Sequence, residues 1–384
     1  MALPQPSPHI VGVAPYKVPR HGAPMDLLLD GIGGLPSPVD LFRGLDDADP
    51  EQLVRAYPST DKLAAALAAH VGVTPDRLIV TGGGDDALDR ACRSLLAPGR
   101  SIVLPVPTFE MIERFARWTG ATLRTVDWSH GDYPVDAVIA CADASTTAVA
   151  VVSPNNPTGA VISASELRRL SAALPDVVLL VDLAYVEFAD EDLTSVVVTL
   201  PNAVGFRTLS KAYGLAGWRM GYAAFPRVLQ PALAKVIDTF EICPTLLSQR
   251  AAAAALATDP AWAMERVAGL APRRIEVLEA VRQWQARGWP VRLWAEPDGA
   301  FYGLLVVDGL RDGWGQPHNS DGLMERLVLE HGVATVSGSA FGLELPGACV
   351  VRLSYGMLGD ADLAEALQRL GRGLERFGLA DPMG

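Results

Sequence analysis

Short apolar runs alternate with amphipathic segments along most of this chain, from about Leu63 onward. The runs are rich in Val, Ile and Leu, and the apolar residues between them recur at the spacing of one helical face. This alternation predicts a doubly wound α/β domain, in which helices cover a largely parallel sheet. The runs expected to form strands of this sheet are 78–80, 102–104, 148–152, 177–181 and 204–206.

Local signals place helices between these strands. The first strand is followed by three glycines at 82–84 and then by apolar residues at helical spacing, so we expect a glycine turn that leads into a helix. Farther along, Ser163 and Glu166 have the spacing of a capping box, which predicts a helix that ends near Leu174. The crossover that this helix forms is expected to be right-handed.

Beyond about Pro260 the pattern changes, which indicates a second, smaller α+β unit. A long helix is predicted at 261–287 and a final helix from Asp360 to about Phe377. Strands are predicted between these two helices, at 291–294, 302–307, 333–336 and 350–353.

The N-terminal segment is too rich in proline for regular structure. Six prolines fall within residues 1–24, so we expect an extended arm there. The predicted division is an arm and part of the small domain at 1–49, a large domain at 50–258 and a small C-terminal domain at 259–384.

Composition narrows the possible partners. Of the 384 residues 49% are apolar and 20% charged, so long disordered stretches are not expected. The net charge is 32 − 44 = −12 and the arginines are dispersed, which argues against nucleic acid or an anionic membrane surface as a partner. The apolar stretches are far shorter than the roughly 18 residues of a membrane span, and the N-terminus lacks signal-peptide features. We therefore expect a cytoplasmic protein.

Cysteine and lysine content narrows the candidate chemistry. The four cysteines are far apart and no histidines stand at ligand spacing, so neither a zinc site nor a disulfide framework is predicted. Only four lysines are available as amine nucleophiles: Lys17, Lys62, Lys211 and Lys235.

An amide, a carboxylate and an amine each follow a predicted strand: Asn156, Asp182 and Lys211. Because ligands of open α/β sheets bind outside the carboxyl ends of strands, we expect these three groups at one edge of the sheet. Ordinary structural roles are the alternatives. Asn155 and Asn156 can form turns, Asp182 can cap a helix, and a lysine is usually exposed.

Four segments resemble, in order and spacing, the signature motifs of class I and II aminotransferases. They are Ser-Pro-Asn-Asn-Pro-Thr-Gly at 153–159, Asp-Leu-Ala-Tyr at 182–185, Thr-Leu-Ser-Lys-Ala-Tyr-Gly-Leu-Ala-Gly-Trp-Arg-Met-Gly-Tyr at 208–222 and Val-Arg-Leu-Ser-Tyr-Gly at 351–356. The resemblance covers roughly Tyr57 to the C-terminus, and the middle of the chain is most similar to the histidinol-phosphate aminotransferase branch. It implies a fold type I transferase that depends on pyridoxal 5'-phosphate (PLP). The implied reaction moves an amino group between an amino acid, or an amine derived from one, and a 2-oxo acid.

The resemblance gives roles to the residues at the strand ends. Lys211 would hold PLP as a Schiff base and then carry the substrate proton as general acid and base. Asp182 would pair with the protonated pyridine nitrogen, which is the cation that a buried carboxylate needs. Tyr185 and the side chain of Asn156 would hydrogen-bond the phenolic oxygen of the cofactor.

Glycines before a helix suit a phosphate, because the backbone amides at a helix N-terminus are free to bind anions. Gly83 and Gly84 are in this position, although they match no nucleotide-binding motif. We expect the side chains of Asp85 and Asp86 to cap the helix, which leaves the amides of Gly84 and Asp85 to the phosphate. By resemblance three side chains complete this site: Thr208, Ser210 and Arg219.

The remaining candidates concern stacking, assembly and substrate. Phe109 matches the aromatic residue that stacks on the cofactor ring, with core packing as the alternative. Tyr57 resembles a tyrosine that reaches the neighbouring subunit's PLP phosphate, which implies a homodimer with shared active sites. Arg352, on an apolar strand, needs an anion, either an internal carboxylate or, by resemblance, the substrate carboxylate. Gly33 is assigned to the substrate side of the site.

Two departures from the histidinol-phosphate branch concern the substrate. That branch usually carries Asn-Glu-Asn-Pro where this chain has 29–35, and 299–302 and 337–342 look more like aspartate-type aminotransferases. The alternative function is therefore a PLP enzyme of specialised metabolism that decarboxylates, eliminates, cyclises or oxidises. A PLP-sensing regulator would need a DNA-binding helix-turn-helix, and the proline-rich arm has no room for one.

Overall fold

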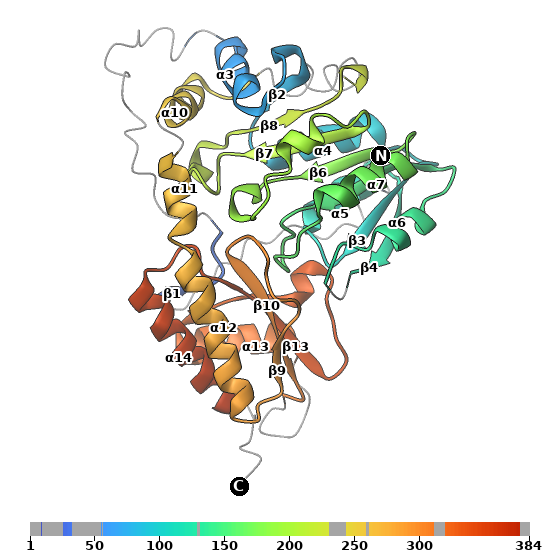
Figure 1. Cartoon of the computed structure of the whole chain (residues 1–384). Helices are drawn as coiled ribbons and strands as arrows, with labels where there is room; N and C mark the ends of the chain where they lie inside the picture. The colour runs from blue at the N-terminus through green and yellow to red at the C-terminus, as the bar shows by residue number, and fades with distance from the viewer. Residues whose placement is uncertain are drawn as a thin grey trace, which may run out of the picture.

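The computed structural model describes residues 9, 26–32, 55, 57–128, 131–229, 243–258, 261–310 and 319–376. Within them the chain forms a large α/β unit, in the upper part of Figure 1, and a smaller α+β unit below it. The predicted arm at 1–24 lies outside the described residues except for His9, and Gly33 lies outside them too.

The large unit is built on a seven-stranded sheet with the order β2-β8-β7-β6-β5-β3-β4. Its strands are β2 (Leu78–Thr81), β3 (Ser101–Val106), β4 (Thr122–Asp127), β5 (Thr146–Val152), β6 (Val178–Asp182), β7 (Ala203–Thr208) and β8 (Gly221–Ala224). The five from β3 to β7 are parallel, and β8 runs antiparallel to both β7 and β2. All five runs predicted as strands of this sheet are confirmed.

Alternate residues of the central strands pack on opposite faces of the sheet, as the two-residue period of a strand requires. One face packs against α4 (Gly84–Leu95) and α5 (Glu110–Trp118). The other packs against α6 (Val135–Cys141), α7 (Ala164–Ala173) and α8 (Thr194–Val197). Because both faces are covered, the central strands are apolar along their whole length, which is why the sequence revealed them.

The capping box predicted for the crossover helix α7 is confirmed. The Ser163 hydroxyl accepts a hydrogen bond from the Glu166 amide at 3.2 Å, and the Glu166 carboxylate accepts one from the Ser163 amide at 2.8 Å.

Three more helices pack beside β2 and β8: α3 (Asp61–Val71), α10 (Leu246–Ala257) and α11 (Ala261–Ala268). Short 3-10 helices complete the set at η1 (Pro75–Arg77), η2 (Val186–Phe188), η3 (Ala216–Trp218), η4 (Arg227–Leu229) and η5 (Gly338–Phe341).

The small unit contains an antiparallel sheet with the order β12-β13-β10-β9. Its strands are β9 (Val291–Leu293), β10 (Tyr302–Asp308), β12 (Val336–Ser337) and β13 (Ala348–Ser354), and its helices are α12 (Ala271–Ala286), α13 (Ser320–His331) and α14 (Asp360–Arg376). A two-residue strand near the N-terminus, β1 (Leu27–Leu28), pairs with β11 (Val333–Ala334). Leu27 and Leu28 therefore pack with the small unit, although they lie far from it in the sequence.

Two predicted elements are wrong in extent. The helix expected at 261–287 is two helices, because Gly269 ends α11 and Pro272, near the start of α12, has no amide hydrogen to continue the first helix. The strand expected at 333–336 is also two strands, since β11 pairs with β1 and β12 pairs with β13.

No helix in the described ranges is long and apolar enough to cross a membrane.

Candidate active site

A cavity of about 250 Å³ lies at the carboxyl ends of β5, β6 and β7. The predicted edge of the sheet is therefore where the candidate side chains meet. Ten of the residues singled out from the sequence line this cavity: Gly84, Asp85, Phe109, Asn156, Asp182, Tyr185, Thr208, Ser210, Lys211 and Arg219.

Lys211 presents its amine inside the cavity. Its Nζ donates a hydrogen bond to the Ile32 carbonyl at 3.2 Å and lies 5.3 Å from the centre of the Tyr185 ring. Burial lowers the pKa of this amine to about 8, although the nearby carboxylates of Asp85 and Asp182 act to raise it. A lysine with this pKa is partly neutral near pH 8, and the neutral amine is the nucleophilic form.

Asp182 ends β6 with its side chain buried, only 6% exposed. One carboxylate oxygen accepts a hydrogen bond from the Ala184 amide at 2.9 Å, which stabilises a turn. The helix cap considered as the alternative is not formed, because the cap position of the next helix, η2, is Tyr185. Burial raises the pKa of this carboxyl to about 7, more than that hydrogen bond lowers it, and no described residue forms an ion pair with it. A cation placed beside Asp182 would stabilise its ionised form.

Tyr185 and Asn156 face the cavity from two different loops. The Tyr185 hydroxyl is buried and makes no hydrogen bond with any described residue. The Asn156 Oδ1 accepts a hydrogen bond from Arg352 Nη1 at 3.0 Å, so its amide NH2 is available as a donor. Asn155, in contrast, bonds to Thr108 at 2.7 Å and to Pro107 at 2.9 Å, and it serves the turn.

An anion site is formed where α4 begins. The helix starts at Gly84, and Gly83 before it has a φ of 100°, a backbone conformation that glycine tolerates. A Cβ atom on Gly83 would lie 2.6 Å from the guanidinium of Arg219, so that guanidinium sits directly over the turn. Thr208 and Ser210 add hydroxyls 2.9 Å apart.

Arg219 reaches this position through an unusual backbone. It has a φ of 52°, one of two non-glycine residues with positive φ in the described part of the chain. Such a conformation is held only where the surrounding structure fixes it, and such residues cluster at functional sites. Its neighbour Asp85 lies 4.0 Å away.

The expectation that Asp85 and Asp86 cap α4 is wrong. The cap position is Gly83, and no side chain caps the helix. Asp86 instead accepts a hydrogen bond from the Gly82 amide at 2.8 Å and pairs with Arg90 one turn later, because residues four apart lie on one helix face. Asp85 faces the cavity.

Arg352 lies on β13, 4% exposed, and no described carboxylate lies within ion-pair distance of it. It donates to Asn156 and, at 2.9 Å, to the Asp30 carbonyl, while its Nε has no hydrogen-bond partner among the described residues. The rings of Tyr302 and Phe341 each lie 5.4 Å from its guanidinium. The internal salt bridge considered as the alternative is therefore absent from the described part of the chain.

Sequence reasoning missed an N-terminal contribution to the site. The carbonyls of Asp30, Gly31 and Ile32 accept hydrogen bonds from Arg352, Ser354 and Lys211 respectively. Backbone carbonyls carry no sequence signal. The apolar residues Leu27, Leu28 and Leu29 were the available clue. The first two pair with β11, and the Leu29 amide donates a hydrogen bond to the Ala334 carbonyl.

Three predicted residues stand apart from these contacts. Phe109 lines the cavity and is the cap residue directly before α5, so its position fits both stacking on a cofactor ring and core packing. Tyr57 is 85% exposed and does not line the cavity. Gly33 lies outside the described residues.

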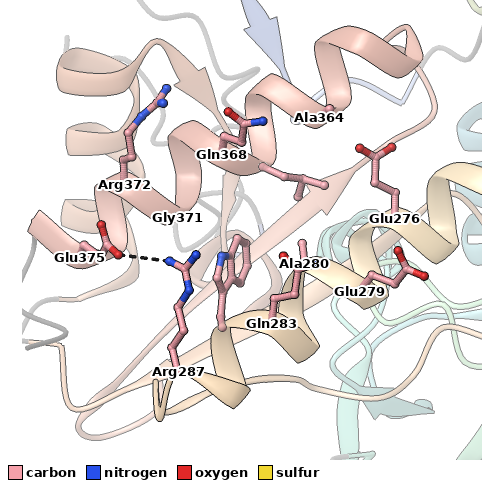
Figure 2. Close-up of a pocket in the computed structure, with 12 residues that line it drawn as sticks. Glu276, Glu279, Ala280, Gln283, Arg287, Ala364, Gln368, Gly371, Arg372 and Glu375 are labelled. Atoms are coloured by element: carbon pink, nitrogen blue, oxygen red, sulfur yellow. Dashed lines mark hydrogen bonds and ion pairs between the residues drawn. The ribbon is translucent and has the colours of Figure 1, made fainter. Parts of the chain in front are cut away.

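A second hollow, of about 500 Å³, lies between α12 and α14 of the small unit (Figure 2). Charged side chains surround it, among them Arg287 and Glu375, which form an ion pair at 3.3 Å. It contains none of the residues predicted for the site, and its charges are those of two solvated helix faces.

The residues of the first cavity fit PLP. The buried Tyr185 hydroxyl and the Asn156 amide could bind its phenolic oxygen, and Asp182 could pair with its pyridine nitrogen. The helix start at Gly84, the Arg219 guanidinium and the hydroxyls of Thr208 and Ser210 suit its phosphate, and all four residues line the cavity.

Comparison with known proteins agrees with this geometry. The sequence profile of the family described as "Aminotransferase class I and II" matches residues 44–370. Histidinol-phosphate aminotransferase 1 of Trichormus variabilis is 33% identical over 256 residues, which are 66% of this chain and 71% of that protein. The histidinol-phosphate aminotransferase of Halalkalibacterium halodurans is 33% identical over 294 residues, 73% of this chain and 78% of the relative.

Solved structures show the same fold. The aspartate aminotransferase from Rhizobium meliloti superposes with a TM-score of 0.81 at 25% identity, and the match covers 97% of this chain and 100% of that one. An aspartate aminotransferase double mutant from Thermus thermophilus gives a TM-score of 0.79 at 25% identity, again over 97% and 100% of the two chains. The protein has the fold type I structure, and it belongs to the class I and II family of PLP-dependent aminotransferases.

Proposed function

We propose that this aminotransferase moves an amino group between an amino acid, or an amine derived from one, and a 2-oxo acid, with Arg352 binding an anionic group of the substrate. The observation that carries this proposal is a buried guanidinium with an unpartnered Nε and no carboxylate partner in the described ranges. A planar guanidinium binds a carboxylate or a phosphate through two parallel hydrogen bonds. Histidinol phosphate is the first amine to test, because relatives 33–36% identical are named for it.

The chain's own residues divide the work of this reaction. Bound PLP supplies an electron sink that acidifies the Cα–H of the amine substrate. Lys211 would hold the cofactor covalently and, once released, carry the proton from Cα, for which a pKa of about 8 is suited. Asp182 would keep the pyridine nitrogen protonated, and Tyr185 would donate to the phenolic oxygen.

We further propose a homodimer in which Tyr57 reaches the PLP phosphate of the neighbouring subunit. The supporting observation is its exposure of 85%, which is high for a large aromatic side chain. Its neighbour Pro58 is anchored by a hydrogen bond from the Cys243 thiol at 2.8 Å, so the segment has a fixed attachment to the large unit. A cytoplasmic location stays a prediction.

The test of substrate class begins with product analysis. Purified PLP-loaded protein is incubated with histidinol phosphate and a panel of amino acids, each with 2-oxo acids, and the products are identified by mass. Arg352→Lys keeps the charge but loses the bidentate geometry, so we expect apparent affinity for the anionic substrate to fall roughly tenfold or more, about 1.5–3 kcal/mol. PLP affinity should not change.

A matched pair of amino-donor substrates separates the possible roles of Arg352. The Arg352→Lys variant should bind an amino donor with a carboxylate more weakly than the wild type does, whereas its affinity for the decarboxylated amine should not change. Equal losses on both donors would show that Arg352 is structural. Arg124→Lys, at the β4 edge of the sheet where Arg124 pairs with Asp143, serves as the control for an unspecific effect.

A further inference from the structure

Arg207 and Glu187 form a buried ion pair, and neither residue lines the cavity. Arg207 Nη2 lies 2.5 Å from Glu187 Oε1, and the two side chains are 5% and 7% exposed. Arg207 also donates to the Thr194 hydroxyl and lies 3.7 Å from Asp192. Taking two charges out of water is costly, and an apolar pair of the same volume is often at least as stable, so stability alone is a weak explanation for this pair.

The pair connects the two segments that carry the cofactor chemistry. Arg207 is on β7 directly before Thr208, and β7 leads to Lys211. Glu187 is in η2, two residues after Tyr185. The ion pair therefore joins the Lys211 side of the site to the Tyr185 side.

Strand pairing does not provide this connection. The ladder between β6 and β7 ends at Asp182 and Phe206, with one further bond of 2.9 Å from the Leu183 amide to the Phe206 carbonyl. Tyr185 lies beyond this point, where the segments that follow β6 and β7 are no longer paired. Rings of the small unit contact the Tyr185 ring, with Tyr302 at 5.0 Å and Phe301 at 5.5 Å, but they do not hold it to β7.

Arginine suits this position because its planar guanidinium holds several N–H donors in a fixed geometry, which sets the directions of its hydrogen bonds as well as their lengths. One nitrogen binds Glu187 in η2 and the other binds Thr194 at the start of α8, so a single side chain on β7 holds the β6–β7 connection at two points. The other polar groups that influence the Arg207–Glu187 pair are Asp192, Tyr213, Tyr222 and His70.

We infer that Arg207 and Glu187 are positioning residues of the active site, which hold the Tyr185 hydroxyl in register with Lys211. This inference rests on the proposed role of Tyr185 as a donor to the phenolic oxygen of PLP. It differs from a merely structural role in one respect: the effect of the pair on the cofactor must pass through the Tyr185 hydroxyl.

The test is a double-mutant cycle read by the visible absorbance of bound PLP as a function of pH. Arg207→Met/Glu187→Met removes both charges together, which avoids an unpaired buried charge. A weaker donor to the phenolic oxygen favours its protonated form, so the pH midpoint should rise by about half a unit or more, roughly threefold in proton affinity. In the Tyr185→Phe background the same double substitution should produce no further shift.

Arg207→Lys is the second variant, in case the double substitution prevents folding. Lysine keeps the positive charge but loses the planar arrangement of donors. The pH midpoint should therefore rise, but by less than in the double variant. Arg273→Lys is the matched control, since Arg273 on α12 is 10% exposed and pairs with Asp360 at 2.8 Å. It should lower the thermal unfolding temperature without moving the pH midpoint.

Three results would overturn the inference. These are an unchanged midpoint in the folded Arg207 variants, a shift of equal size in both backgrounds, and a Tyr185→Phe protein whose own midpoint equals that of the wild type. The last result would also remove the proposed role of Tyr185. The amino-transfer function is tested separately by product identification and would stand in all three cases.

Discussion

Replacing Asp182 by Asn should stabilise the PLP-free protein while weakening its use of PLP. Burial raises the pKa of this carboxyl from an ordinary 3.8 to about 7. At ~1.4 kcal/mol for each unit of pKa, this difference corresponds to about 4 kcal/mol of destabilisation by the ionised group. Asn keeps an oxygen for the Ala184 amide but must bury an NH2, so we expect a net gain of about 2–4 kcal/mol in the free energy of unfolding.

The gain should depend on pH in a defined window. Below pH 3.8 the carboxyl is protonated in both the folded and the unfolded chain, and it contributes no difference. Between pH 3.8 and about 7 the unfolded chain ionises while the folded chain retains the proton, so the wild type loses stability progressively as pH rises. The advantage of Asp182→Asn should therefore be full above about pH 7 and shrink as pH falls.

Urea unfolding of PLP-free protein at pH 8 and pH 5, at one fixed protein concentration, measures this advantage. Asp76→Asn is a control of opposite sign, because hydrogen bonding from Thr74 lowers the pKa of that exposed carboxyl. It should give no gain at either pH. In the PLP-loaded protein, Asp182→Asn should reduce turnover by orders of magnitude, since the pyridine nitrogen loses its counter-charge.

The reasoning would be refuted by an Asp182→Asn protein that is no more stable than the wild type at pH 8. A gain of the same size at pH 5 and pH 8 would also contradict it, because the stabilisation would then not come from titration of this carboxyl. Near-normal turnover would show that Asp182 serves only the turn at Ala184.

Three further predictions concern the cofactor. Lys211→Ala should abolish the borohydride-reducible PLP adduct, and peptide mapping that finds the adduct on another lysine would contradict this. Gly83→Ala should weaken PLP binding by roughly five- to a hundredfold, about 1–3 kcal/mol, since the new Cβ meets the Arg219 guanidinium at 2.6 Å in a backbone with positive φ. Titration of PLP-free protein with PLP measures the affinity, and an unchanged value would refute the anion site at the start of α4. Tyr57→Phe should lower PLP affinity, and mixing it with Lys211→Ala protein should restore wild-type affinity in sites that take Lys211 and Tyr57 from different chains; no restoration would argue against shared sites.

The central strands could be predicted because burial on both faces requires unbroken apolar runs. β4 escaped prediction because it lies at the sheet edge, where only one of its six residues is buried, and β8 because Gly-Tyr-Ala-Ala resembles no apolar run. The two boundary errors arose where periodicity continued through a break, at Pro272 in one case and at a change of partner strand in the other. The local pattern of apolar residues reflects which residues are buried. Which strands pair with each other depends instead on residues far apart in the sequence.

The sequence by itself determined which residues share the edge of the sheet. Asn156, Asp182 and Lys211 each follow a strand, and parallel strands bring their carboxyl ends together whatever the details of packing. The motifs around them were sufficient to indicate the family and PLP.

Only the tertiary structure decided the pKa values of these groups and the partners that hold them in position. Arg352 meets the Asp30 carbonyl across 322 positions of sequence, and it meets Asn156 across 196. Arg207 and Glu187 became a buried pair, and Asp85 turned toward the cavity instead of capping its helix. The physical reason is that pKa and hydrogen bonding depend on burial and on neighbours in space, which a linear pattern does not contain.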